Sequence, residues 1–306
     1  MAHDNVVVVG IDGSEAGETA LQWALAQAKA RNARLHIVCA YEMPTYAAHA
    51  ELNVPVAENN FLYEAAEEMV ATAVASVQGQ GVEVTSSLEF GDPTEVLVEM
   101  SKEVALIVVG GHSGEKGRLA DRLLRTVSSG VPAYAYCPTV VIPQGSLAEY
   151  LPIKHVVVGV DGSEPAKTAL QRAVWEADRW NAKLSIVAAV NAAPTPWIPM
   201  TPFREDLLVE VTEAVAAQLT EVDEGRDIDV RIHAVEGNPA QVLTECGEEI
   251  DLLIVGTRGH GGFTGLLLGS TSQTVLAHAA CPVMVVPKRV RPDDDAGPAP
   301  EQAMAN

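Results

Sequence analysis

An internal duplication constrains the fold of this chain more than any other feature of its sequence. The segment "VVVVGIDGSE" at 6–15 returns as "HVVVGVDGSE" at 155–164, and "TALQWALAQAKARNARLHIV" returns as "TALQRAVWEADRWNAKLSIV". Farther along each copy, "FGDPTEVL" matches "EGNPAQVL" and "CPTVVIP" matches "CPVMVVP". At 306 residues the chain is long enough for two domains. We therefore expect two copies of one domain, at 1–145 and 153–290, with a connector around 144–154.

Within each copy, short continuous runs of Val, Ile and Leu alternate with longer stretches of helical periodicity. In the first copy the apolar runs are 6–11, 34–41, 82–90, 104–110 and 139–142. Continuous runs of this length are typical of parallel strands covered on both faces. The pattern predicts an α/β fold: two tandem doubly wound, mainly parallel five-stranded α/β layer-sandwich domains with pseudo-twofold symmetry. We expect two separate sheets, so one continuous sheet would contradict this architecture.

Two apolar stripes in the first copy predict helices between these strands. They consist of Leu21, Ala24, Leu25 and Ala28, and of Leu62, Ala66, Met69 and Ala73. Ser14 and Ser163 stand where an N-cap is needed, and Pro165 suits the first turn of a helix.

Charge, hydropathy and cysteine content exclude several classes of protein. The formal net charge of −21 argues against a broad nucleic-acid-binding surface, but it leaves room for a small anion held locally. No apolar run approaches the roughly 20 residues of a membrane-spanning helix, and the start "MAHDNVVVVGIDG" lacks the basic region of a secretory signal. The four cysteines form no CxxC pair. We expect reduced thiols and a cytoplasmic protein with no membrane partner.

A glycine-rich segment in the second copy, "VGTRGHGGFTGLLLGST" at 255–271, follows the apolar run "DLLIVG". Ligands of open α/β sheets bind beyond the carboxyl ends of the strands. The next segment reads as a helix with Ser270, Thr271 and Ser272 in its first turn, and a helix N-terminus attracts anions. Glycine lets the backbone approach such an anion closely. We therefore expect a phosphate site, in which Gly269 lets a backbone N–H approach the phosphate.

The spacing of these glycines matches neither the Walker phosphate loop nor the dinucleotide fingerprint. It is Gly256, Gly259 and Gly269-Ser270, or G-2x-G-9x-G-S. Together with Asp161 after the first apolar run of this copy and Asn-Ala-x-Leu before the second, the pattern resembles the ATP-binding branch of the universal stress protein family. The resemblance covers nearly the whole chain, once per repeat.

The resemblance implies a nucleotide site in the second copy. Asp161 would meet the ribose or adenine side, and the backbone near Ala189 would bind the adenine. The phosphates would be held by Gly256, Gly259, Gly269 and Ser270. The implied cofactor is ATP, with Mg²⁺ as an additional candidate whose protein ligands the spacing does not identify.

The first copy departs from this pattern. The positions that correspond to the site are Asp12, Ala40, Gly111, Gly114 and Thr126. Ten residues instead of nine separate Gly114 from Arg125, and Arg125-Thr126 replaces Gly269-Ser270. Arg125 either obstructs the phosphate path or supplies a guanidinium to it.

Each candidate also has a purely structural interpretation. Asp12 and Asp161 suit turns and helix starts, and the glycines suit a flexible surface loop. The two loop histidines are typical of solvated side chains, and the hydroxyls near the helix starts serve either as caps or as phosphate acceptors. These residues are His112, His260, Ser128, Ser129 and Thr271.

The sequence favours binding of a nucleotide over its turnover. Phosphoryl transfer needs carboxylates that hold a metal ion and a base near the γ-phosphate, and each copy offers one loop aspartate. We therefore expect an ATP-binding regulatory protein of the stress response, with adenine nucleotide as its partner. A nucleotide-independent interaction scaffold and a slow ATPase remain the alternatives, and a homodimer or a further protein partner stays open.

The family resemblance also bears on assembly. In the strand order of the family, "TVVIP" and "VMVVP" lie at sheet edges, and a long apolar edge needs cover. Pairing of these two edges within the chain would reproduce the dimer formed by single-domain relatives.

The acidic C-terminal segment, "DDDAGPAPEQAMAN", has no apolar periodicity. We expect 291–306 to be a disordered tail. Deletion of 293–306 should therefore leave the midpoint of thermal unfolding unchanged in differential scanning calorimetry. A clear decrease of the midpoint would mean that the tail is docked on the fold.

Overall fold

The computed structural model describes seven stretches of the chain: 4–42, 57–111, 126–143, 150–190, 201–245, 250–259 and 267–288. The predicted tail lies outside them, as do Gly114, Arg125 and both loop histidines. The first half consists of β1 (Asp4–Gly10), α1 (Glu15–Arg31), β2 (Arg34–Tyr41), α3 (Ala57–Val77), β3 (Val84–Phe90), α4 (Pro93–Met100), β4 (Val104–Gly110), α5 (Val127–Tyr134) and β5 (Thr139–Ile142).

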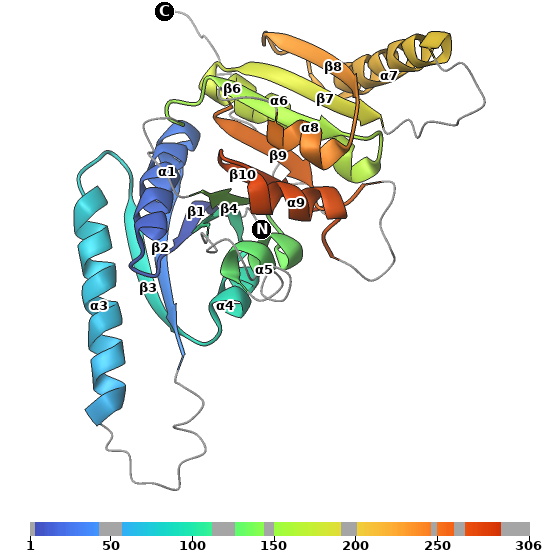
Figure 1. Ribbon diagram of the computed structural model, residues 1–306. Helices are drawn as coiled ribbons and strands as arrows, with labels where there is room; N and C mark the ends of the chain where they lie inside the picture. Colours follow the sequence, from blue (N-terminus) through green and yellow to red (C-terminus); the bar gives the residue numbers. More distant parts are fainter. Residues whose placement is uncertain are drawn as a thin grey trace, which may run out of the picture.

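The second half repeats this order of elements. It consists of β6 (His155–Val160), α6 (Glu164–Trp180), β7 (Lys183–Val190), α7 (Thr201–Val222), β8 (Val230–Glu236), α8 (Pro239–Glu245), β9 (Leu252–Gly256), α9 (Ser270–His278) and β10 (Val283–Val286). The α/β fold and the five strands predicted for each copy are confirmed, with strand boundaries in the first copy within two residues of the predicted ones (Figure 1).

One ten-stranded sheet runs through both halves, in the order β3-β2-β1-β4-β5-β10-β9-β6-β7-β8. The neighbouring strands are parallel except β5 and β10, which pair antiparallel with Val140 opposite Met284. Pairing of the two apolar edges is therefore confirmed, whereas the expectation of two separate sheets is wrong. Because the pairing is antiparallel, the strands of the two halves run in opposite directions. Their carboxyl ends therefore lie at opposite ends of the strands' common direction in the sheet.

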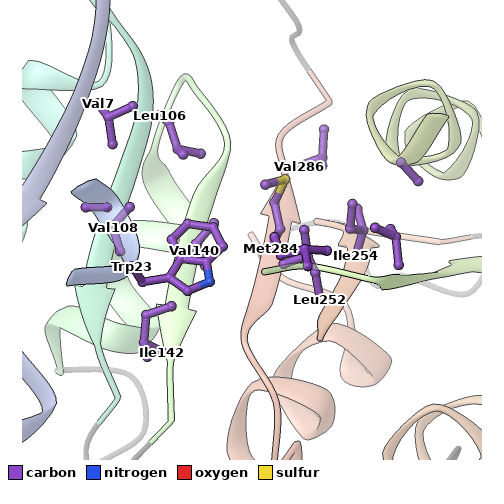
Figure 2. Packing of buried hydrophobic residues seen from close by; sticks show 14 of the residues in the cluster. Val7, Trp23, Leu106, Val108, Val140, Ile142, Leu252, Ile254, Met284 and Val286 are labelled. Atoms are coloured by element: carbon purple, nitrogen blue, oxygen red, sulfur yellow. The ribbon is translucent and has the colours of Figure 1, made fainter. Parts of the chain in front are cut away.

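Helices cover both faces of this sheet. Side chains from α1, α3, α6 and α7 share one buried cluster that extends across both halves, whereas α4 with α5, and α8 with α9, cover a separate cluster in each half. Figure 2 shows the shared cluster on either side of the β5–β10 pair, with Trp23 of α1 beside Val140 and Met284 beside Leu252. The two copies therefore fold around one continuous apolar layer.

Local sequence signals set the ends of the first helix in each half. The hydroxyl of Ser14 accepts a hydrogen bond from the N–H of Gly17 at 3.1 Å, and that of Ser163 accepts one from Ala166 at 3.3 Å, which confirms both N-caps. Each helix ends at an asparagine with φ of 50°, a left-handed conformation that Asn tolerates well.

One residue of the predicted apolar stripes is not in the core. Leu62 is 39% exposed, whereas Ala66, one turn later in α3, is 6% exposed. The buried contacts of α3 begin at Ala66, so the preceding turn extends past the apolar layer. Periodicity identified the correct face of the helix but not where that face meets the core.

The cysteines that the structure describes are buried and form no disulfide with one another, namely Cys39, Cys137 and Cys281. Burial raises the pKa of the Cys281 thiol to about 12, which keeps it protonated and unreactive. In the part of the chain that the structure describes, no helix has the length and apolar character needed to cross a bilayer.

A buried ionic cluster joins the helices α1 and α6 across the two halves. The Glu176 side chain is fully buried, and its Oε1 atom lies 3.0 Å from Arg172 Nε and 3.1 Å from Arg179 Nη1. Arg31 of the first half forms the third ion pair to the same oxygen. Burial alone would raise the pKa of Glu176, but Arg31, Arg179 and Arg172 lower it to about 2. The equivalent position in the first half is Gln27, so the cluster is specific to the pairing of unlike halves.

Replacement of Glu176 by glutamine should destabilise the protein by roughly 3 to 5 kcal/mol, because three guanidinium groups, that of Arg172 buried and those of Arg31 and Arg179 largely so, lose their anion. The difference from the wild type should be full above pH 4.5, the ordinary pKa of the group, and should shrink as pH falls toward 2. Denaturant unfolding between pH 7 and pH 3 measures both effects.

The matched control is Glu99→Gln, which removes the exposed pair with Lys102 and should have little effect on stability, because solvent and salt screen that pair. If Glu176→Gln were no more harmful than this control, or equally harmful at every pH, the cluster would not stabilise the junction of the halves.

Candidate functional site

A cavity of about 330 Å³ opens at the carboxyl ends of the second-half strands. The ends of β6, β7 and β9 form its floor, and the start of α9 forms one side. All six positions predicted for the second site line this cavity, namely Asp161, Ala189, Gly256, Gly259, Gly269 and Ser270. The sequence-based selection therefore brings together residues from three strand ends, one loop and one helix start.

The base of the glycine-rich loop is closed by two hydrogen bonds. The N–H of Gly269 donates to the carbonyl of Thr257 at 2.7 Å, and the hydroxyl of Ser272 donates to the carbonyl of Gly256 at 2.7 Å. Both ends of the loop are thus held against the end of β9. The segment 260–266 between them lies outside the described residues.

The bond to Thr257 engages the N–H of Gly269 itself, so the backbone N–H groups that could meet a phosphate are those that follow it. Gly269 is the N-cap of α9, and no side chain among the described residues caps this helix. The N–H groups of Ser270 and Thr271, in the first turn, have no intrahelical partners. They are the backbone donors that this helix offers to an anion in the cavity.

Gly256 is required by packing within the protein. A Cβ atom at Gly256 would lie 2.9 Å from the carbonyl oxygen of Pro165, at the start of α6. In the first half a Cβ atom at Gly110 would lie 2.8 Å from the carbonyl carbon of Ala16. Both glycines therefore let the fourth strand of a half approach its first helix, whether or not a ligand binds.

The strand register also revises which glycine of the first half corresponds to Gly256. Gly110 and Gly256 each pair with the last residue of the neighbouring strand, β5 or β10. The sequence comparison had matched Gly111 to Gly256, but Gly111 takes the place of Thr257. The difference is one residue, and it arises because the first-half loop is longer.

The two aspartates both have the structural role that their sequence context predicts. Asp161 Oδ1 accepts a hydrogen bond from the N–H of Ser163 at 3.0 Å. Asp12 Oδ1 accepts the N–H of Ser14 at 3.0 Å and its hydroxyl at 2.5 Å. Each carboxylate thus organises the turn that leads into the first helix of its half, and each also stays exposed at the carboxyl edge of the sheet.

The first half brings together part of its predicted site. Asp12 follows β1, and the register of β1 with β2 places it next to Ala40. Thr126 is the N-cap residue of α5, and its hydroxyl lies 3.0 Å from that of Ser129 without capping the helix. Ser128 and Ser129 lie in the first turn of α5, but Gly114 lies outside the described residues.

Two features of the second-half cavity were missed at the level of sequence. Arg258 lines the cavity. Its place in the sequence, between the motif glycines Gly256 and Gly259, could have identified it as a site residue. An apolar wall is formed by Val187, Leu243 and Leu268, which come from separate elements and had no shared sequence pattern. Asp161 and Arg258 are the charged residues among the described lining.

The described residues contain no group of three or more His, Cys, Asp or Glu side chains that could hold a metal ion. Asp161 is the single carboxylate among the described cavity-lining residues. A magnesium ion at this position would therefore depend on oxygen ligands from the phosphates in addition to this carboxylate.

Comparison with known proteins gives consistent results for both halves. The sequence model of the Universal stress protein family matches residues 5–143 and 152–287. Universal stress protein Rv1996 of Mycobacterium tuberculosis H37Rv is 31% identical over 315 aligned positions, which cover 96% of this chain and 97% of that protein. Universal stress protein Rv2623 of the same organism is 32% identical, with coverage of 91% and 95%.

Solved structures show the same fold. A universal stress protein from Archaeoglobus fulgidus DSM 4304 has a TM-score of 0.69 at 21% identity and covers 92% of this chain and 96% of its own. A protein of unknown function from Pseudomonas aeruginosa PAO1 has a TM-score of 0.62 at 17% identity, with coverage of 94% and 93%. The family match to both halves, and relatives of equal length, show that this chain belongs to the universal stress protein family.

Proposed function

We propose that the chain is an ATP-binding regulatory protein of the stress response and that it binds nucleotide in the second-half cavity without turning it over. The observation that carries the proposal is Gly269, a glycine that the fold itself does not need. Its φ of −71° is open to any residue, and among the described residues a Cβ atom there would meet none closer than 3.5 Å. Ser, Thr, Asp or Asn would cap α9 as well or better.

Because the N-cap residue Gly269 has no side chain, there is room for a ligand at the start of α9. The first-turn N–H groups of Ser270 and Thr271 face this space, and the helix dipole makes it favourable for negative charge. Arg258 adds a guanidinium to the lining of the same cavity. Phosphate fits this combination of backbone donors, positive charge and free volume.

The remaining lining suits the nucleoside part of the ligand. Leu243 and Val187 present an apolar wall of the kind that accepts the face of a base. Ala189 lies at the end of β7, where its backbone is available to the edge of the adenine, and Asp161 is available to the ribose hydroxyls. Turnover is not part of the proposal, because the described cavity offers one carboxylate and phosphoryl transfer needs more.

Gly269→Val should weaken ATP binding by about ten- to a hundredfold, because the side chain fills the space next to the first-turn N–H groups, and a lost charge-assisted hydrogen bond costs roughly 1.5 to 3 kcal/mol. Isothermal titration calorimetry measures the affinity, and circular dichroism checks the fold.

Ala277→Val is the matched control, because it adds the same side chain to an exposed position of the same helix. It should leave the affinity for ATP unchanged. Equal affinity of Gly269→Val and the wild type would mean that this position does not face the phosphates.

Protein purified without added nucleotide and then denatured should release adenine nucleotide, identified by chromatography and mass spectrometry. We expect about one nucleotide per chain, contributed by the second half. Absence of both copurified nucleotide and ATP binding in titration would favour the scaffold function. Steady release of inorganic phosphate at saturating ATP would favour a slow ATPase.

A further inference from the structure

In each half the aspartate that follows the first strand lies close to a glycine. A Cβ atom at Gly17, in the first turn of α1, would lie 2.9 Å from Asp12 Oδ1. In the second half a Cβ atom at Gly259, in the glycine-rich loop, would lie 2.0 Å from Asp161 Oδ2. Carbon atoms of side chains do not approach other atoms this closely, so each carboxylate occupies space that a side chain would need.

The glycine beside the aspartate has exchanged places between the halves. The helix position taken by Gly17 in the first half is taken by Ala166 in the second. The loop position taken by Gly259 is taken in the first half by Ser113, counted from Gly110 and Gly256. Each half therefore has a glycine at one of the two positions and a side chain at the other.

Backbone conformation does not account for either glycine. Of the glycines in this chain, those in the left-handed region include Gly13 and Gly162 but neither Gly17 nor Gly259. The φ angle of neither position therefore requires a glycine. The close approach of a carboxylate is the feature that both glycines share.

We propose that Gly259 is a glycine in order to admit the carboxylate of Asp161, and that Asp161 thereby positions the first turn of the glycine-rich loop. In the second half the side chain of Ala166 stands at the helix position that Gly17 holds in the first half. In the first half the described neighbour of Asp12 is the first turn of α1. Asp161 is a positioning residue here, in addition to any contact that it makes with a ligand.

This arrangement holds the described part of the loop, 257–259, at two points. Thr257 is held through its carbonyl by Gly269, and Gly259 lies against Asp161. Arg258 lies between these two points, so its direction depends on both. A side chain at Gly259 must displace either the carboxylate or the loop, and each displacement changes where Arg258 lies.

A double-mutant cycle separates this role from a direct role in phosphate binding. Gly259→Ala is introduced into the wild type, into Asp161→Asn and into Asp161→Ala. Asparagine keeps the size of the side chain, so the clash should persist in the first two backgrounds, whereas Asp161→Ala removes it. Coupling of this kind between residues in contact appears as non-additive effects.

Local cleavage by trypsin after Arg258, without nucleotide, is the first readout, because it reports the position of the loop and not global stability. We expect Gly259→Ala to raise the cleavage rate about tenfold in the wild-type and Asp161→Asn backgrounds and less than twofold in the Asp161→Ala background. Asp161→Ala alone should also raise it, whereas Asp12→Ala, the matched control from the first half, should not. Equal increases from Gly259→Ala in all three backgrounds would overturn the proposal.

Affinity for ATP is the second readout, and it rests on the proposed function. Gly259→Ala should weaken binding about tenfold in the wild-type background and less than twofold in the Asp161→Ala background. If the effects of the two substitutions on the affinity for ATP multiply instead, Gly259 contacts the phosphate directly and the proposal is wrong. If the wild type binds no ATP, the proposed function fails, and the trypsin cycle still decides the role of Asp161.

Discussion

The antiparallel pairing of β5 with β10 is the contact on which the rest of the structure depends. It covers the two apolar edges that the separate copies would expose and lets one buried cluster extend across both halves. It also makes the strands of the second half run opposite to those of the first. The two candidate sites, each at the carboxyl ends of its strands, therefore lie on opposite sides of the sheet along the strand direction. The two candidate sites are therefore separate, and the halves that carry them are joined by the shared core and the ion pairs of Glu176.

The fold could be predicted from sequence because its signals are local and occur twice. Apolar runs, serine caps and the terminal asparagines each act over a few residues, and the second copy checks the first. The ion pair of Arg31 with Glu176 could not be predicted, because its partners lie in different copies and Gln27 replaces the glutamate in the first. The continuous sheet could not be predicted for a related reason. Strand pairing between β5 and β10 joins different copies, and the sequence pattern within each copy carries no information about it.

The members of the site could be predicted, but not what each one does. The glycine spacing selected three residues that line the same cavity, yet their neighbours differ. Gly256 lies against Pro165, Gly259 lies against Asp161, and Gly269 lies against no atom within 3.4 Å. A spacing pattern treats these as equivalent because it contains no information about packing. Among the described contacts, Gly269 is the one of the three glycines that packing does not require, which is why the proposed function rests on it.

The exchange of glycine between helix and loop restricts how two such copies can diverge. With side chains at both positions the carboxylate would have to turn away from both of them, toward solvent. On the proposed role of Gly259, the effect of a serine or alanine at one position therefore depends on the residue at the other. A path of single substitutions through a form with glycine at both positions avoids this conflict, because the aspartate then meets a side chain at neither.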